Sequence, residues 1–576
     1  MTDAYNACLN YTAAETAGLE PLVGFIDLIV KAFPEKASDG LITKDDDLGK
    51  VMLVFAQHSI PTFEFIQPVK DAINPVSLAL DVVQYRPAAS IKAEELALKI
   101  TAFEEEANQL LNADRRSETA DIPIKFTLAD VTSVAPELGH DFVIKSLSPP
   151  GYIPEELNFA PGYFGNLSAL LANTTADTLK GYFVWKAAIT LSTYVEAEAM
   201  HKLTDVKAIL SGLDPDIIGQ GARWQQCIAR IEGGVGWIET SNGLGWILGR
   251  FFIDRAYSEA ARELTTTLMN TIQREFITRL ADKTWLSDEV RKVAEEKVRA
   301  MALKIGYPDA SPKTVDPQGM AAYYRDLEIG ESFFNNTISS AAWYTAKLWS
   351  SLNKPSDKAM WGESPTVVNA YYSPQLNDIT ILAGIQQQPL YDVEYPSYIN
   401  YGGLGTVLGH ELTHGFDNVG HKFAPNGSLS NWFDESSEKA FTERAGCFVK
   451  QYSEFSVAAP NGTRVHVKGD STLGENIADA GGLAASFAAW KRQQADGTAN
   501  DYDLPGLGNF TYDQLFFVKY AQSWCTVSGS PGYDVWLINN DAHSPGFARI
   551  KGGLDNTQEF KKAFNCPVKE ARCELW

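Results

Sequence analysis

The chain has 576 residues, 45% of them hydrophobic, which is enough for two large units with substantial cores. Its 72 acidic residues outnumber 49 basic ones, and the formal net charge of −23 argues against a nucleic-acid partner and for an acidic, soluble surface. No apolar run approaches the roughly 18–20 residues of a membrane span, and no signal peptide is visible.

The cysteines and the glycosylation sequons are the sequence features that relate to the cellular compartment of the protein. The six cysteines are scattered without a C-x-x-C pair, which excludes a zinc-finger arrangement. Sequons of the form N-x-[ST] are compatible with a secreted protein, although they are also common by chance. Seven are present, at Asn10, Asn166, Asn173, Asn335, Asn426, Asn461 and Asn509.

The first part of the chain, residues 19–333, is predicted to be mainly helical. Residues 22–33 and 93–111 have the apolar spacing of amphipathic helices, and residues 256–303 form the clearest long helical stretch, with a break near residues 282–285. None of these segments carries an obvious catalytic group.

The character of the sequence changes after about residue 358. Residues 366–372 and 378–382 are rich in β-branched and aromatic side chains and flank a turn, so they predict two strands. An edge strand beside a peptidase cleft can hydrogen-bond an extended substrate, and Asn369 can add its side-chain amide. A plain hairpin without that role is the alternative.

Residues 407–417 (VLGHELTHGFD) predict a helix that carries an H-E-x-x-H motif. His410 and His414 lie one turn apart on the same face, where two imidazoles can bind one zinc ion. Glu411 points beside the metal rather than at it, and there it can take a proton from a water activated by zinc. A chance pair of helix histidines is the alternative, so the motif needs support from elsewhere.

A catalytic zinc ion needs a third protein ligand. Glu475 opens a second predicted helix, residues 474–490, and is the best candidate; Asp479 lies on the same face of that helix. Asp479 and Asp417 can each accept a ring N–H from a zinc-binding histidine. A surface acidic pair is the alternative for Glu475 and Asp479.

A metzincin arrangement does not fit. That motif needs a glycine and a third histidine at set positions after His414, but Asp417 and Gly420 occupy them. His421 is one residue out of register and is interpreted as an ordinary loop histidine.

Residues 541–549 predict a loop that carries His543 and Arg549. Peptide hydrolysis builds an oxyanion, which His543 can stabilise, and Arg549 can bind a substrate carbonyl. Ordinary surface residues are the alternative.

Taken together, these motifs resemble those of the neprilysin and endothelin-converting enzyme family of zinc metallopeptidases, in the family order and over nearly the whole chain. The matching segments are Asn369 to Tyr372, Val407 to Asp417, Gly474 to Asp479, Asp541 to Arg549, and Cys573 to Trp576. The resemblance implies a mainly α fold with a small β component: a thermolysin-like zincin catalytic lobe, residues 336–576, and a large helical lobe, residues 1–335, that caps it around a central cavity.

The resemblance also implies roles by position, with one Zn²⁺ per chain. His410, His414 and Glu475 would be the metal ligands, and Glu411, His543 and Asp479 the catalytic residues, with Asp417 and Asp479 supporting the ligands. The implied substrate-binding residues are Asn369, Ala370, Arg549, Ile385, Leu390, Val407 and Trp524, the last four of which would line the pocket for the side chain after the cleaved bond.

The resulting hypothesis is a zinc metalloendopeptidase that cleaves peptides and small polypeptides on the amino side of hydrophobic residues. A catalytically inactive relative that binds peptides is the alternative from another class. An aminopeptidase zincin is disfavoured, because Glu475 lies far beyond His414 for that arrangement.

The family pattern further implies disulfides between Cys8 and Cys227 and between Cys447 and Cys573, and an extracellular or cell-surface location. Cys525 and Cys566 would pair with cysteines of an upstream segment that this sequence does not contain. We therefore expect the sequence to be an N-terminally shortened version of a secreted or membrane-anchored enzyme; a short cytosolic form with free thiols is the alternative.

Overall fold

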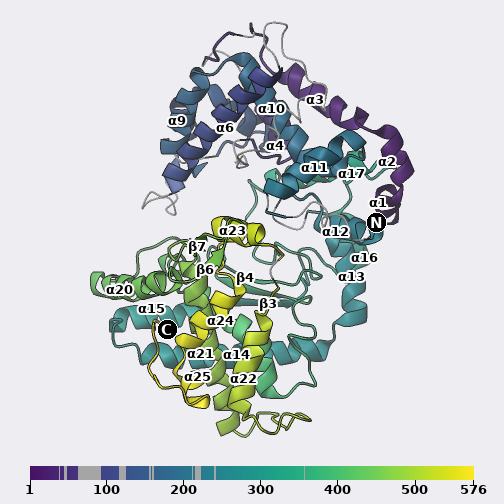
Figure 1. Cartoon of the computed structure of the whole chain (residues 1–576). Helices are drawn as coiled ribbons and strands as arrows, with labels where there is room; N and C mark the ends of the chain where they lie inside the picture. The colour runs from purple at the N-terminus through teal and green to yellow at the C-terminus, as the bar shows by residue number, and fades with distance from the viewer. Residues whose placement is uncertain are drawn as a thin grey trace. The chain divides into compact units, whose positions relative to one another are not determined.

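The computed structural model describes residues 1–576 except 38, 44–47, 63–92, 116–124, 155–156, 159–160, 211, 214–221, 239–241, 356 and 528. The described chain is mostly helical with a few short strands, as the sequence predicted (Figure 1). It divides into two compact units. Unit 1 comprises Met1–Gly245 and Ala321–Asp357, and unit 2 comprises Trp246–Met320 and Lys358–Trp576.

The expected single boundary after residue 335 is not where the chain divides, because it falls inside helix α17 (Phe333–Trp349) of unit 1. Helical content was the wrong criterion for the boundary. The long helices α14 (Glu259–Ala281) and α15 (Asp288–Ala300) bury their apolar faces in the core of unit 2, so they belong there and not with the helical unit.

Unit 1 is a helical body around one hydrophobic core. In α3 (Glu20–Ala32), Leu22, Phe25, Ile26 and Ile29 are buried, which confirms the helix predicted from their spacing. The remaining elements are α1 (Thr2–Leu9), α2 (Tyr11–Ala17), α4 (Gly49–Gln57), α6 (Ala93–Arg115), β1 (Lys125–Phe126), α7 (Leu128–Val134), η1 (Pro136–Leu138), α8 (His140–Leu147), β2 (Leu157–Asn158), α9 (Pro161–Ala172), α10 (Ala176–Leu191), η2 (Ser192–Tyr194), α11 (Glu198–Leu210) and α12 (Arg223–Gly233). A disulfide between Cys8 and Cys227 joins α1 to α12, as the family resemblance implied.

Unit 2 contains a three-stranded sheet in the order β3-β5-β4. The central strand β5 (Asp378–Leu382) pairs in parallel with β3 (Ala302–Gly306), with Ala302 opposite Asp378, and antiparallel with β4 (Ala370–Ser373), with Ala370 opposite Ile381. All five residues of β5 are buried, as expected for a central strand. The strand predicted to start at residue 366 starts only at Ala370, and β4 forms one edge of the sheet.

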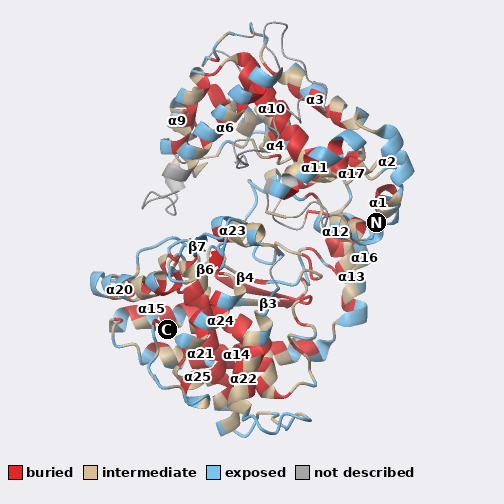
Figure 2. Cartoon of the chain, viewed as in Figure 1, coloured by how far each residue is buried: buried red, intermediate tan, exposed pale blue. Residues whose placement is uncertain are grey.

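Helices pack beside this sheet and form most of unit 2, where buried residues are concentrated in α14, α21 and α22 (Figure 2). Helix α19 (Thr406–His414) continues directly from a π-helical turn, η3 (Tyr401–Gly405). Helices α13 (Gly245–Ala256) and α16 (Pro317–Tyr323) lie mostly in unit 2 and contain the points where the chain passes from one unit to the other. The other elements of unit 2 are α18 (Ser397–Asn400), η4 (Gly420–Lys422), α20 (Glu435–Tyr452), β6 (Ser456–Ala458), β7 (Arg464–His466), α21 (Leu473–Ala495), α22 (Tyr512–Ser523), α23 (Pro531–Asn540), α24 (Gly546–Asp555) and α25 (Gln558–Ala563).

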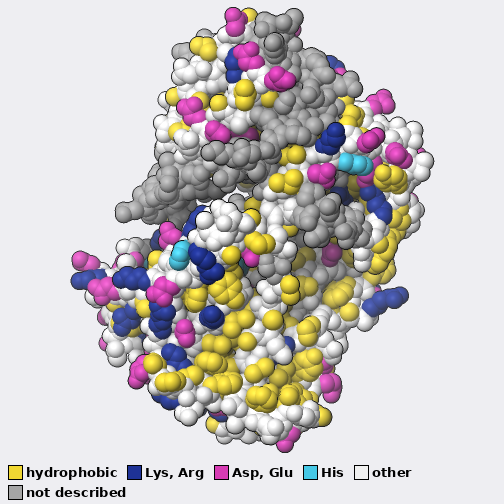
Figure 3. All heavy atoms as spheres, viewed as in Figure 1, with side chains coloured by type: hydrophobic (Ala, Val, Ile, Leu, Met, Phe, Trp, Pro, Cys, Tyr) yellow, Lys and Arg dark blue, Asp and Glu magenta, His cyan; other side chains and the backbone are white. Residues whose placement is uncertain are grey.

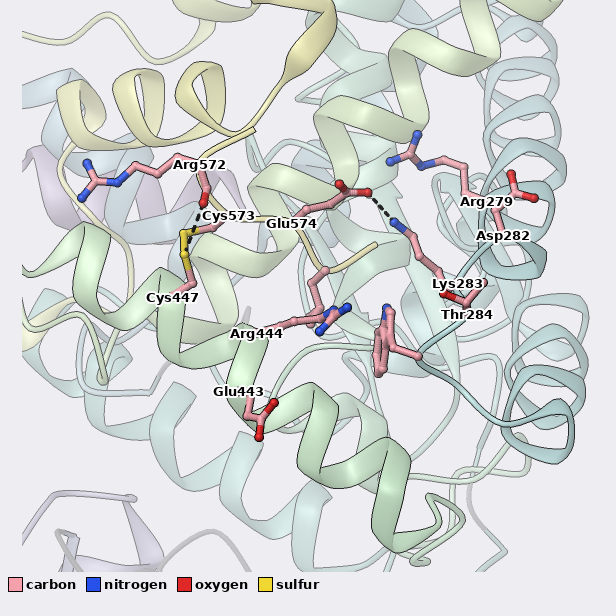
Figure 4. Close-up of a pocket in the computed structure, with 12 residues that line it drawn as sticks. Arg279, Asp282, Lys283, Thr284, Glu443, Arg444, Cys447, Arg572, Cys573 and Glu574 are labelled. Atoms are coloured by element: carbon pink, nitrogen blue, oxygen red, sulfur yellow. Dashed lines mark hydrogen bonds and ion pairs between the residues drawn. A yellow bond between two sulfur atoms is a disulfide. The ribbon is translucent and has the colours of Figure 1, made fainter. Parts of the chain in front are cut away.

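The C-terminal residues of the chain are packed against the rest of unit 2. The predicted disulfide between Cys447 and Cys573 is present, and Lys283 forms an ion pair with Glu574 beside it (Figure 4). Trp576 is buried and donates its indole N–H to the carbonyl oxygen of Phe416, 3.0 Å away. Closing a loop of this length by a disulfide contributes about 2–5 kcal/mol to stability. The two remaining cysteines, Cys525 and Cys566, are free thiols.

The surface carries both signs of charge. On the face shown in Figure 3, Asp and Glu side chains are scattered over both units with Lys and Arg side chains between them. Among the described helices, none is both long enough and apolar enough to cross a membrane.

Candidate metal centre and active site

Three side chains from two helices converge on one point. His410 and His414 lie on the same face of α19, and their Nε2 atoms are 3.0 Å apart. Glu475, in the first turn of α21, places its Oε2 atom 3.1 Å from His410 Nε2 and 3.5 Å from His414 Nε2. Within the described residues, these three are the cluster whose ligand atoms could hold a metal ion.

The arrangement fits a tetrahedral zinc ion. With zinc–ligand distances of about 2.0–2.1 Å, neighbouring ligand atoms in a tetrahedral site are about 3.3 Å apart, and the observed separations of 3.0 to 3.5 Å bracket that value. Glu475 Oε2 is buried and accepts no hydrogen bond of good geometry, although imidazole nitrogens surround it. A cation at the centre of the group would account for a buried carboxylate oxygen left in this way.

Close packing of α19 on α21 brings the ligands together. The two helices touch through backbone atoms at Gly409 and Gly482. A Cβ atom added at Gly482 would lie 2.4 Å from the backbone nitrogen of His410, and one added at Gly409 would lie 2.6 Å from the carbonyl oxygen of Gly482. Because only glycines allow this approach, Glu475 comes within reach of both histidines.

Carboxylates support both imidazoles from behind. Asp479 accepts a hydrogen bond from His410 Nδ1 at 2.9 Å, and Asp417 one from His414 Nδ1 at 2.6 Å. Asp417 is itself held by the backbone N–H groups of Val419 and Gly420. These contacts leave each Nε2 atom facing the centre of the group, which is the tautomer that binds a metal. The helix ends at His414, so Asp417 reaches its partner from the turn that follows.

Electrostatics in the site favour ionised carboxylates. Burial opposes ionisation of Glu475, but the imidazoles of His410 and His414 beside it outweigh burial and hold its pKa far below the usual range. Burial also opposes ionisation of Asp479, and the adjacent Arg549 guanidinium keeps the pKa of that carboxyl low.

Glu411 differs from the other carboxylates of the site. It is 5% exposed and lies on α19 between the two histidines. Burial raises its pKa above the usual value, against the opposing effect of the histidines. A carboxylate whose pKa is raised toward neutrality is a better general base, because it binds a proton more readily.

Arg549 and His543 complete the polar side of the site. Arg549 lies on α24 and not in a loop as predicted, because the helix begins at Gly546, directly after Pro545. The residue is 7% exposed, and its guanidinium makes two hydrogen bonds to Asp479 at 2.7 and 2.8 Å and stacks over Trp524. His543 does precede the helix, with its Nε2 atom 3.2 Å from Glu475 Oε2. A hydrogen bond to Asp541 and the nearby carboxylate of Glu475 raise the pKa of His543 to about 9.

One pocket of about 910 Å³ contains the predicted site. Among its walls are Glu411, His543, Arg549, Asp417 and the three candidate ligands, whereas Asp479 lies behind His410. The predicted substrate-binding residues also line it: Asn369, Ala370, Ile385, Leu390, Val407 and Trp524. Sequence reasoning missed Lys519 and Gln522, which line the same pocket from α22. Lys519 lies three residues before Gln522 and four before Ser523, which also lines the pocket, and this helical spacing was a signal that could have found them.

His421 is not the ordinary loop residue that was predicted. It is buried in η4, where its Nδ1 atom bonds to the Asp417 carbonyl oxygen at 2.7 Å and its ring stacks on Phe441. Its Nε2 atom faces Glu438 at 3.3 Å, so it stands outside the metal-binding group.

The sequence matches the family described as Peptidase family M13 at residues 369–573, and the N-terminal part of the same family at residues 77–308. The chain belongs to peptidase family M13. The family resemblance predicted from the sequence motifs is therefore confirmed.

Relatives in the M13 family carry related names. The chain is 34% identical over 432 residues to an endothelin-converting enzyme homolog of Locusta migratoria, covering 73% of this chain and 56% of that protein. It is 33% identical over 429 residues to neprilysin-3 of Drosophila melanogaster, covering 73% and 52%, and 32% identical over 483 residues to human endothelin-converting enzyme 1, covering 82% and 59%. The matches thus span between half and three fifths of the length of these relatives.

Solved structures share the fold. The crystal structure of the Mycobacterium tuberculosis zinc metalloprotease Zmp1 in complex with an inhibitor superimposes with a TM-score of 0.78 at 22% identity, covering 100% of this chain and 87% of that one. The crystal structure of PepO from Lactobacillus rhamnosis HN001 gives 0.77 at 20% identity, covering 100% and 88%.

Proposed function

We propose that this M13 family member is a zinc-dependent metalloendopeptidase that hydrolyses peptides and small polypeptides on the amino side of hydrophobic residues. The observation that carries the proposal is the convergence of His410, His414 and Glu475 beside Glu411 in one large pocket. His410, His414 and Glu475 hold one Zn²⁺, and Asp417 and Asp479 orient the two imidazoles.

Glu411 acts as the general base. When bound, zinc lowers the pKa of a water molecule and polarises the substrate carbonyl. Glu411 accepts the proton of the attacking water, which its raised pKa favours, and then passes it to the leaving amine.

The oxyanion of the transition state needs donors. His543 carries a proton at neutral pH because its pKa is about 9, so its imidazolium can donate to the developing negative charge. Arg549 is held in place by Asp479, lines the pocket and binds a substrate carbonyl. Asp479 thus positions both a metal ligand and a substrate-binding residue.

Edge strand β4 binds the substrate backbone. Ala370 belongs to this strand and Asn369 directly precedes it; both line the pocket. An extended peptide can add alongside an exposed sheet edge through main-chain hydrogen bonds. The side-chain amide of Asn369 donates to Glu363 at 3.2 Å, which orients it for its role.

The pocket for the side chain after the cleaved bond is mainly apolar. In this proposal it is formed by Ile385, Leu390, Val407 and Trp524, all of which line the large pocket. One methylene more or less in such a pocket changes binding by only about 1–3 kcal/mol, so the preference among hydrophobic residues is graded.

An extracellular or cell-surface location is part of the proposal. The two disulfides, one in each unit, are bonds that persist in oxidising compartments and are rare in the cytosol.

The test is cleavage of an N-terminally acetylated peptide with an internal Leu. We expect cleavage before the Leu, loss of activity on chelation, recovery on adding zinc, and one zinc ion per chain. Glu411→Gln should keep its zinc and lose at least roughly 10²–10⁴-fold in kcat, because the ligands remain while proton transfer is lost. A zinc-loaded protein that binds the peptide without cutting it would support the inactive, peptide-binding alternative, and unimpaired hydrolysis by Glu411→Gln would refute the role of Glu411.

A further inference from the structure

Three polar residues of helix α22 line one side of the 910 Å³ active-site pocket. Lys519, Gln522 and Ser523 are spaced at i, i+3 and i+4 along α22, so they share one helix face, and all three line the pocket. Leu390 and Pro389, from a different segment, line the same pocket.

Lys519 is an unusual member of that wall. It is 6% exposed, and its Nζ atom donates to the carbonyl oxygen of Pro389. Among the described residues it forms no ion pair with a carboxylate, and burial lowers its pKa. An ammonium group has three donors, so one carbonyl oxygen leaves it under-satisfied. A buried, unpaired cation is costly for a fold, and such groups concentrate at functional sites.

The backbone provides a place for this side chain. The stem of Lys519 lies against η3, where a Cβ atom added at Gly403 would lie 2.8 Å from Lys519 Cε and one added at Gly402 would lie 3.2 Å from Lys519 Cβ. The glycines therefore leave room for the lysine to extend toward Pro389, next to Leu390. This position puts the ammonium group beside the apolar lining residues and not out in solvent.

We propose that Lys519 is a specificity-determining residue that extends the pocket's preference to side chains with an apolar stem and a terminal carboxylate, Glu foremost. The proposal rests on the proposed endopeptidase function and deepens it. The two methylenes of a Glu side chain pack on Leu390 and Val407, while the carboxylate accepts the free donors of Lys519. Charge-assisted hydrogen bonds of this kind are stronger than neutral ones, particularly away from water. Asp is one methylene shorter and reaches Lys519 less well.

The experiment uses four peptides, acetylated at the N-terminus and amidated at the C-terminus, that differ only in the residue after the cleaved bond: Leu, Gln, Glu or Lys. Amidation removes the terminal carboxylate, so any preference must come from the side chain. We expect the wild-type chain to cleave the Glu peptide with kcat/KM within about tenfold of the Leu peptide and above the Gln peptide, and to disfavour Lys. In Lys519→Met, which keeps the length and loses the charge, the Glu-to-Leu ratio of kcat/KM should fall at least roughly tenfold.

Lys491→Met is the matched control, because Lys491 is a surface lysine of α21 paired with Asp513. The Glu-to-Leu ratio of this variant should equal that of the wild type.

A measurement on the wild type keeps the test independent of how well the Lys519 variant folds. As pH rises through the lowered pKa of Lys519, the Glu-to-Gln ratio should fall, since both peptides share every other ionisation.

The outcomes separate the two proposals. Cleavage of the Leu peptide with no Glu cleavage, or an unchanged Glu-to-Leu ratio in Lys519→Met, overturns the role of Lys519 and leaves the peptidase function standing. No cleavage of any peptide by the zinc-loaded chain overturns both.

Discussion

Adding one methyl group at Gly482 tests whether the contact between α19 and α21 sets the spacing of the metal ligands. In Gly482→Ala, the new Cβ would lie 2.4 Å from the backbone nitrogen of His410 and 2.8 Å from the Cα of the same residue, where ordinary contacts are 3.4–4 Å. Backbone cannot rotate away as a flexible side chain can, so the two helices must separate by about 1 Å. Metal sites tolerate deviations of only about ±0.2 Å in ligand distance.

Two opposing effects act on stability. Replacing a helical Gly by Ala stabilises an exposed helix by up to about 1 kcal/mol, while forcing extra volume into a packed core costs about 1–3 kcal/mol. The change in melting temperature is therefore small, and zinc affinity is the decisive readout. Since a displacement of 1 Å in an active site can cost about 10²-fold in rate, we expect activity to fall by about that factor, and zinc affinity to fall with it because the ligand distances change.

The assay is a zinc titration against a competing chelator, with melting temperature measured in the metal-free state. Gly446→Ala is the matched control, because Gly446 lies in α20 of the same unit and an added Cβ meets no atom within 4 Å. Its zinc affinity should equal that of the wild type. If Gly482→Ala bound zinc as tightly as Gly446→Ala, the helix contact would not set the ligand geometry and the reasoning would be wrong.

Two further predictions concern the residues around the ligands. Asp479→Ala should lose roughly 10–100-fold in zinc affinity or activity, because His410 loses its hydrogen-bond partner. It should also lower the melting temperature, because the buried guanidinium of Arg549 loses its charged partner. An unchanged zinc affinity and an unchanged melting temperature would contradict this role of Asp479. Zinc retention in chelator-buffered dialysis should fall as the pH falls from 8 to 5.5. Although burial lowers the pKa of His414, Asp417 and Glu475 raise it well above 6.5, so protons compete with zinc for this imidazole even near neutral pH. Zinc retention that does not change with pH would show that protons do not compete for His414.

The sequence was most informative where chemistry depends on fixed local spacing. His410, Glu411 and His414 follow from a five-residue pattern, and β5 was predicted with its observed bounds because every position is apolar, β-branched or at a turn. The helix carrying Glu475 was also predicted, but its distance to the histidines was not, since it depends on the contact between Gly409 and Gly482, which are distant in the sequence.

Features that depend on tertiary packing were missed or misplaced. The pairing of Arg549 with Asp479 joins residues 70 positions apart in the sequence, so no local sequence pattern predicts it. In the sequence, Lys519 is indistinguishable from an exposed helix lysine, because the packing of its side chain against Gly402 and Gly403 appears only in the structure. The boundary between the units was misplaced because both units are helical, and composition alone does not say which core a helix covers.

The interleaving of the two units has a consequence for the order in which they fold. The chain builds part of unit 2, passes back to unit 1 at residue 321, and returns to unit 2 at residue 358. The core of unit 1 includes Phe334 of α17, so during synthesis it stays incomplete until that helix has been made. Strand β3 is made long before its partner, because β5 follows it by more than seventy residues in the sequence. Forming a contact between residues so far apart in the sequence slows folding. A nascent chain therefore exposes the apolar side of α14 and β3 until α19 and α21 emerge, and that interval is when the growing polypeptide most needs a chaperone.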